Sequence, residues 1–306
     1  MFGWPMPRCN VPMTRSPDDP MSPSPLASSL ERLYESFDHP ESALDPIQIV
    51  RRYPRVEDRE IVAFVAAGLA FGRVASVMAS VEAVCAVMGA TPGAFVRDFA
   101  PRRDGVALRH LVHRWTRGDD IIGLLWILRA LIEAHGSLEL AFAAGSRADA
   151  LHVGDALERF STEARGVDLR PVYGPRVPDR PGAYYFFSRP STGGACKRLN
   201  LFLRWMIRRD GVDPGGWQAI PASQLIVPLD THTIRVGKCL RLTKRVSPGW
   251  KMAVDITDAL RLVDAADPIR YDFALCHLSM MGSCGWRTKR GNAQCPLRGL
   301  CKPGKP

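Results

Sequence analysis

The sequence has no apolar segment long enough to cross a lipid bilayer. Its longest apolar runs, at 61–72 and 121–128, fall well short of the roughly 20 residues that a membrane-spanning helix needs. The first residues also lack the apolar stretch of a secretory signal. We therefore expect a cytoplasmic protein with no membrane partner.

The sequence also has little that favours β-strands. No stretch of useful length alternates apolar and polar residues, and no internal repeat is visible. Helical patterns are found at 28–40 and at 119–136, where the second segment opens with an aspartate cap and stops at a glycine. Residues 61–89 are apolar on nearly every face, as in a core helix, with a break that brings Arg73 to the surface. The pattern predicts an all-α fold.

The length of 306 residues exceeds the ~100 to 200 residues usual for one domain, so we expect two lobes. We place one helical lobe at 57–225 and the other at 26–56 plus 226–306. Residues 1–25 contain seven prolines among polar residues, a composition that cannot bury enough apolar surface to order itself. They are predicted to form a disordered tail.

Positive charge is concentrated in the C-terminal part of the chain. The net charge is +10, and residues 189–306 hold 20 Lys and Arg against 8 Asp and Glu, a net +12. Lysine and arginine bind polyanions by releasing counterions from phosphates. This asymmetry indicates a surface that binds nucleic acid, although a solvated basic face would give the same count.

A glycine turn opens directly into a basic amphipathic helix near Ala195. Gly193 and Gly194 would let backbone amides approach a phosphate closely. One turn into the polar face of the helix lies Lys197, and the positive charge of Arg198 and Arg204 should lower its pKa toward the range of a nucleophile. An ordinary surface lysine is the alternative interpretation.

An aspartate, Asp230, ends an apolar run and stands where a helix cap belongs. Many such aspartates only cap. A carboxylate held by backbone amides nevertheless stays ionised, so Asp230 could also stabilise positive charge on a sugar or accept a proton from an amine.

Upstream of Lys197 and Asp230, the irregular segment 165–190 carries four aromatics at 184–187. These aromatics either line a pocket for a base or anchor the loop to the core.

These two motifs resemble those of the helix-hairpin-helix DNA glycosylases, the endonuclease III superfamily. The family has a Gly-x-Gly-x-Lys hairpin and an aspartate in Val-Asp-Thr-His-x-x-Arg-Val. This sequence keeps Gly193, Lys197, Asp230, Thr231, His232, Arg235 and Val236. Ala195 replaces the second glycine, and the longer gap from Lys197 to Asp230 is more similar to archaeal 8-oxoguanine glycosylases. Segments 58–74 and 199–210 resemble an uncharacterised bacterial branch of the superfamily.

The resemblance implies a two-lobed helix-hairpin-helix glycosylase fold that binds lesion-containing double-stranded DNA, as a nucleoid-associated monomer. The damaged base is flipped from the duplex, and either Phe71 or Arg73 is expected to act as the wedge that fills its place. The resemblance further implies that Lys197 attacks the deoxyribose C1′ while Asp230 stabilises the developing charge. Further DNA contacts are expected from the hairpin and the C-terminal loop, at Gly193, Gly194, Arg198, Arg204, Arg287, Lys289 and Arg290.

Four of the eight cysteines, Cys276, Cys284, Cys295 and Cys301, lie in the last 31 residues. In a reducing compartment such clustering indicates a metal site more than disulfides. The last three resemble the cluster loop of the endonuclease III family, which implies a [4Fe-4S] cluster, with zinc as the alternative for the same ligands. The second cysteine ligand of that family is absent between Cys284 and Cys295. Cys276 either replaces it or is a small buried side chain.

We therefore expect a base-excision repair enzyme, a DNA glycosylase with AP lyase activity, that removes a damaged base, an oxidised purine among the candidates. A non-catalytic helix-hairpin-helix DNA-binding protein is the alternative from another class. A monofunctional glycosylase that uses Asp230 and water is the third interpretation.

Overall fold

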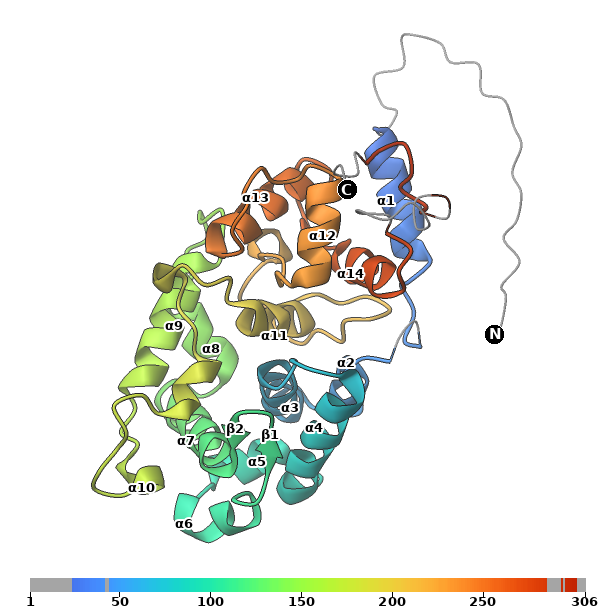
Figure 1. The fold of residues 1–306 in the computed structure, drawn as a ribbon. Coiled ribbons are helices and arrows are strands. Elements are labelled where there is room, and N and C mark those ends of the chain that lie inside the picture. The colour runs from blue at the N-terminus through green and yellow to red at the C-terminus, as the bar shows by residue number, and fades with distance from the viewer. Residues whose placement is uncertain (1–23, 42–43, 285–292, 294, 302–306) are drawn as a thin grey trace, which may run out of the picture.

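A computed structural model describes residues 24–41, 44–284, 293 and 295–301, and the regular secondary structure of these residues is almost entirely helical (Figure 1). The α-helices are α1 (Pro25–Glu35), α2 (Ile47–Val50), α3 (Val56–Gly68), α4 (Val74–Met88), α5 (Pro92–Arg97), α6 (Pro101–Asp104), α7 (Gly118–His135), α8 (Leu138–Ala143), α9 (Gly154–Gly166), α10 (Arg170–Tyr173), α11 (Lys197–Ile207), α12 (Thr231–Cys239), α13 (Trp250–Arg261) and α14 (Asp272–Met280). Short 3-10 helices lie at Gly105–Ala107, Gly182–Phe186, Pro190–Thr192 and Ala222–Gln224.

The strands of the described segments are confined to one small hairpin, in which β1 (Val112–His113) pairs antiparallel with β2 (Thr116–Arg117). The prediction of a nearly all-α protein is thus confirmed at the level of fold class. No helix within the described ranges has the length and apolarity that a membrane span requires. The expected tail at 1–25 lies outside the described residues up to position 23, and Ser24 and Pro25 are the cap and first residue of α1.

Helix α11 lies in the middle of the molecule, with α1, α12, α13 and α14 on one side and α3 and α4 on the other (Figure 1). It packs against α3, while α12 packs against α14. The predicted boundaries of two lobes stay a prediction. The arrangement places the N-terminus of α11 next to elements that come from both ends of the sequence.

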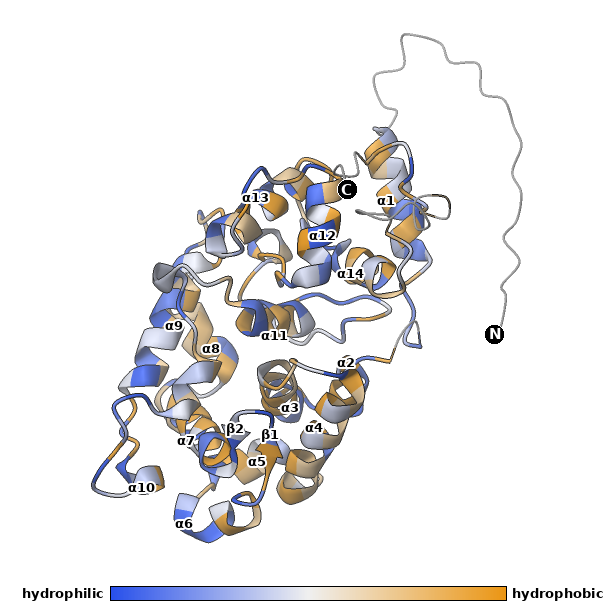
Figure 2. Ribbon diagram, in the orientation of Figure 1, coloured by the Kyte–Doolittle hydropathy of each residue, from blue (hydrophilic) through white to orange (hydrophobic). Residues whose placement is uncertain are grey.

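The helix pair predicted within 61–89, with a break near Gly72, is confirmed as α3 and α4. Figure 2 shows α3 apolar around much of its circumference, in keeping with a helix that is enclosed by neighbours. Phe64 of α3 packs against Phe202 of α11, with ring centroids 4.9 Å apart, and against Phe187, at 5.4 Å. Phe187 is fully buried, so this member of the aromatic run anchors its loop to the core.

Two predicted helix starts need correction. Helix α1 begins at Pro25 rather than near Ser28, because the Ser24 side chain accepts a hydrogen bond from the amide of Ala27. In α7 the cap position is Arg117, and Asp120 accepts a hydrogen bond from its amide at 2.8 Å. The predicted stop is confirmed, since Gly136 ends α7 with a positive φ of 91°.

A buried ion network joins α11 to α14 and to the loop that follows α11. Arg204 donates to Asp213 at 3.0 Å and to Asp272, the first residue of α14, at 2.8 Å. Arg208, one turn further, pairs with Asp213 and, at 2.8 Å, with Asp267. The side chains of Arg204, Arg208, Asp213 and Asp272 are all at most 4% exposed. Such a network resists the loss of any one member, because the remaining charges are left buried without partners.

We predict that Arg204→Met lowers the free energy of unfolding by about 3 to 5 kcal/mol, the range for breaking a buried ion pair. Chemical denaturation monitored by circular dichroism measures this change. The matched control is Arg103→Met, because Arg103 also pairs with two aspartates but its side chain is 59% exposed. The control should change stability by at most about 1 kcal/mol. Equal effects of the two substitutions would contradict a structural role for the network.

Candidate functional site

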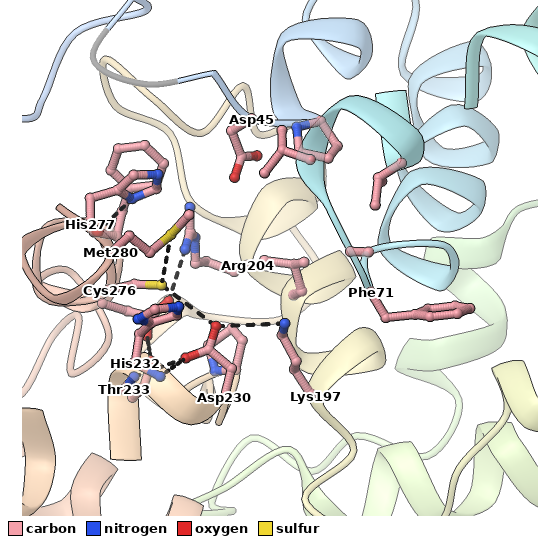
Figure 3. Close-up of a pocket in the computed structure, with 18 of the residues that line it drawn as sticks. Asp45, Phe71, Lys197, Arg204, Asp230, His232, Thr233, Cys276, His277 and Met280 are labelled. Atoms are coloured by element: carbon pink, nitrogen blue, oxygen red, sulfur yellow. Dashed lines mark hydrogen bonds and ion pairs between the residues drawn. The ribbon is translucent and has the colours of Figure 1, made fainter. Parts of the chain in front are cut away.

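One cavity of about 490 Å³ brings together residues from distant parts of the sequence. Its wall is formed by the start of α11, the start of α12, one face of α14 and the turn between α3 and α4 (Figure 3). The polar lining residues are Asp45, Lys197, Arg204, Asp230, Thr231, His232, Thr233, Asp272, Cys276 and His277. A cavity of this size is within the range of small-molecule sites.

The structure places Lys197 and Asp230 side by side in this cavity. The Lys197 Nζ atom lies 3.6 Å from Asp230 Oδ2. The lysine is the first residue of α11 and its side chain is 35% exposed, so its amine is reachable from the cavity. The two motifs that the sequence singled out therefore meet in space, although Asp230 lies 33 positions after Lys197.

The turn before Lys197 has a left-handed backbone. Gly193 has φ 81° and Cys196 has φ 50°, which is unusual for a residue with a side chain. The Gly193 carbonyl accepts a hydrogen bond from the Trp250 amide, the first of α13, at 3.0 Å. A Cβ on Gly249 would lie 2.6 Å from that carbonyl oxygen, so a side chain at Gly249 does not fit. The turn is thus fixed against the start of α13.

Asp230 caps α12, as predicted, and faces Lys197 with its free oxygen. Its Oδ1 atom accepts hydrogen bonds from the amides of His232 and Thr233, both at 2.8 Å. Burial alone would raise the pKa of the carboxyl group. The positive charge of Lys197 and the two amide hydrogen bonds outweigh burial and bring the pKa below its ordinary value. Asp230 is therefore a carboxylate that is held in place by one oxygen and presents the other to the cavity.

Cys276 lies in this cavity, against Asp230. Its Sγ atom is 3.5 Å from Asp230 Oδ2 and 3.9 Å from Met280 Sδ (Figure 3). Burial, followed by the negative charges of Asp230 and Asp272, raises the pKa of the thiol well above its ordinary value. Cys276 is therefore a neutral donor to Asp230 in this structure. The residue that the sequence suggested as a fourth metal ligand thus bonds to Asp230.

The thiols of Cys284 and Cys301 lie next to a different cysteine, Cys239. Hydrogen bonds with these two thiols, together with burial, raise the pKa of Cys239. Cys239, Cys284 and Cys295 are all buried. Within the described ranges, no set of three or more His, Cys, Asp or Glu side chains is arranged to hold a metal ion. The sequence analysis missed Cys239 because it lies 45 residues before Cys284, at the last position of the helix that Asp230 caps.

The structure corrects the expected role of Arg204. Its guanidinium lies in the buried ion network, so it is not available to contact a phosphate. Arg198 stacks on Tyr185, with its Cζ 3.3 Å from the ring centroid, and donates to the Tyr185 carbonyl. Gly193, Gly194 and Arg73 are exposed, as their expected contacts with DNA require. Phe71 is partly buried and lines the cavity. Arg287, Lys289 and Arg290 lie outside the described residues.

These residues define a mostly helical protein in which a lysine and an aspartate from two different helices share one cavity. Residues 45–281 match the DUF2400 family, described as a protein of unknown function, and the chain belongs to this family. The matched segment contains every described residue that lines the cavity. No curated protein and no solved structure matches the chain.

We predict that Asp230→Asn makes Cys276 react faster with iodoacetamide at mildly alkaline pH. Removing the carboxylate charge should lower the pKa of the thiol and so raise its reactive thiolate fraction several-fold. Mass spectrometry of the Cys276 peptide over time measures the rate. Asp119→Asn, at a carboxylate 56% exposed on α7, serves as the control and should leave the rate unchanged. An unchanged rate in Asp230→Asn would rule out the electrostatic contact.

Proposed function

We propose that this protein is a DNA glycosylase with AP lyase activity, built on the two-lobed helix-hairpin-helix glycosylase fold. It removes a damaged base, an oxidised purine among the candidates, from double-stranded DNA. The observation that carries the proposal is the approach of Lys197 Nζ to Asp230 Oδ2 at the wall of one cavity. An amine nucleophile beside an ionised carboxylate is the pair that this reaction requires.

In the proposed reaction, Lys197 Nζ loses a proton and the lone pair of the resulting amine forms a bond to C1′ of the deoxyribose. The bond between C1′ and the base breaks, and its electron pair leaves with the base. Asp230 stabilises the positive charge that builds on the sugar, and its Oδ2 atom is placed to take the proton that the amine loses. Opening of the sugar ring gives a Schiff base, from which loss of a proton at C2′ expels the 3′ phosphate and cleaves the strand.

The rest of the cavity supports this assignment. Phe71, Phe273 and Met280 provide apolar surface for a flat base, and Cys276 is a neutral hydrogen-bond donor. Flipping a nucleotide costs a few kcal/mol of unstacking, which contacts within the cavity must offset. The exposed glycine turn at 193–194 lies just before Lys197, where a phosphate next to the flipped nucleotide would pass. This arrangement favours an enzyme over a protein that only binds DNA.

Borohydride trapping on duplex DNA tests the proposal. The wild-type protein should form a covalent adduct with an abasic-site duplex and with duplexes that contain the right oxidised base, and Lys197→Ala should form none. Lys251→Ala, which removes an exposed lysine on α13, is the matched control and should trap normally.

Three other outcomes separate the alternatives. Base release without trapping would identify a monofunctional glycosylase that uses Asp230 and water. Equal DNA binding by wild type and Lys197→Ala, with neither base release nor trapping, would identify a non-catalytic DNA-binding protein. Trapping that persists in Lys197→Ala would show that another amine is the nucleophile.

We further propose that Cys239, Cys284, Cys295 and Cys301 rearrange to hold a [4Fe-4S] cluster, or zinc at the same ligands, although no three of them are arranged around an ion in the described segments. Four thiolates are the donor set that both groups prefer. The thiols of Cys284 and Cys301 each interact with that of Cys239, which supports this set, and binding would displace the protons of the thiols. A bound metal would supply local rigidity here by joining the end of α12 to the C-terminal segment.

Metal analysis of protein purified without oxygen distinguishes the ligand set that contains Cys239 from the set expected from the sequence, which contains Cys276 instead. Cys239→Ala should lose bound iron or zinc, and the visible absorbance if the metal is iron-sulfur, whereas Cys276→Ala should keep both. Cys85→Ala, at a buried cysteine on α4, controls for the loss of any core thiol. Loss of metal in Cys276→Ala with retention in Cys239→Ala would restore the ligand set expected from the sequence. Wild-type protein without iron or zinc would overturn both sets.

A further inference from the structure

A cluster of three aromatic rings lies directly beside the cavity, where the short β1–β2 hairpin meets two other segments. Trp115, in the turn of the hairpin, stacks on Phe71 with ring centroids 4.5 Å apart and an angle of 18° between the planes. Tyr185 meets both rings edge to face at 5.7 Å. Phe71 lines the cavity, so Trp115 is one ring removed from it. We call Phe71, Trp115 and Tyr185 the aromatic platform.

The aromatic platform leaves a large aromatic side chain in solvent. Trp115 is 53% exposed even though Phe71 covers one face of its ring, and Tyr185 is 37% exposed. Exposing an indole costs hydrophobic free energy, and Trp and Tyr in such positions are typical of binding surfaces.

The hairpin holds Trp115 rigidly in this position. His113, only 3% exposed, bonds the Phe71 carbonyl with one ring nitrogen at 3.0 Å and Ser80 Oγ with the other at 2.9 Å. The next residue, Arg114, has a positive φ of 56°, a conformation that costs free energy in a residue with a side chain. The hydrogen bonds of His113 and the strained backbone of Arg114 thus hold a turn that exposes the indole of Trp115 to solvent.

The charged side chains that lie over the rings of the aromatic platform are arginines. The Arg114 guanidinium lies 5.3 Å from the Trp115 ring centroid, and Arg198 stacks on Tyr185. Arg73 and Arg117 are exposed on the adjoining elements. Aromatic rings interleaved with arginines are the surface that single nucleic-acid strands use, since bases stack on the rings while the cations meet the phosphates.

We propose that the aromatic platform binds an unstacked nucleobase of the same DNA whose neighbouring nucleotide enters the cavity. The inference rests on the proposed function, because that function brings DNA to the cavity. It extends the proposed function by naming the class of DNA substrate. The preferred substrate is DNA with unpaired bases at or next to the lesion, such as a bulge, a mismatch or a single-stranded stretch. Trp115 determines this preference and takes no part in the chemistry.

Fluorescence of 2-aminopurine tests the proposal. A short strand with one 2-aminopurine, either single or fully paired, is titrated with wild-type protein, Trp115→Ala and Trp115→Phe. Wild type should quench the probe in the single strand and bind it more tightly than the duplex. Trp115→Ala should lose the quench and about tenfold in affinity for the single strand, as the loss of one stacked base predicts. Trp115→Phe should retain part of both.

The controls keep this test separate from that of the proposed function. Leu262→Ala removes another exposed apolar side chain, 90% exposed at the end of α13, and should behave as wild type. Lys197→Ala should still quench the probe. A wild-type protein that quenches the probe but is not trapped by borohydride would support the aromatic platform and contradict the proposed lyase activity. Unchanged quenching and affinity in Trp115→Ala would overturn the inference and leave the proposed function standing. A wild-type protein that binds no DNA would overturn both.

Discussion

The buried ion network around Arg204 determines where the two residues of the candidate site lie. Lys197 begins α11, and Asp230 caps α12, which packs against α14. Arg204 ties α11 to the first residue of α14, Asp272. Asp272 in turn accepts a hydrogen bond from the Thr233 hydroxyl on α12 at 3.4 Å. The approach of amine to carboxylate thus depends on buried charges that hold the helices together, and a weaker network would let the pair separate.

Asp230 combines structural and chemical roles because a carboxylate has two oxygens. One oxygen accepts hydrogen bonds from backbone amides at the start of α12, where the first N–H groups of a helix have no partner within the helix. The other faces Lys197 and the Cys276 thiol. The charge of Lys197 and the capping hydrogen bonds together keep the group ionised in a partly buried place, so the fold supplies the charge that the proposed chemistry needs.

Local patterns predicted the parts of the fold that local forces determine. The break between α3 and α4 and the cap at Asp230 follow from neighbouring residues alone. The role of Arg204 could not be predicted in this way, since helical spacing marks a polar position without naming its partners, which lie at 213 and 272. Cys239 and Trp115 were missed for the same reason: each gains its neighbours only when distant segments fold together.

The bond from the Trp250 amide to the Gly193 carbonyl ties the turn before Lys197 to α13, not to the segment that leads on to Asp230. A side chain at Gly249 would push the turn away from the start of α13 and so change the direction from which the amine enters the cavity. The orientation of the amine thus depends on a glycine that lies 52 positions after Lys197 in the sequence.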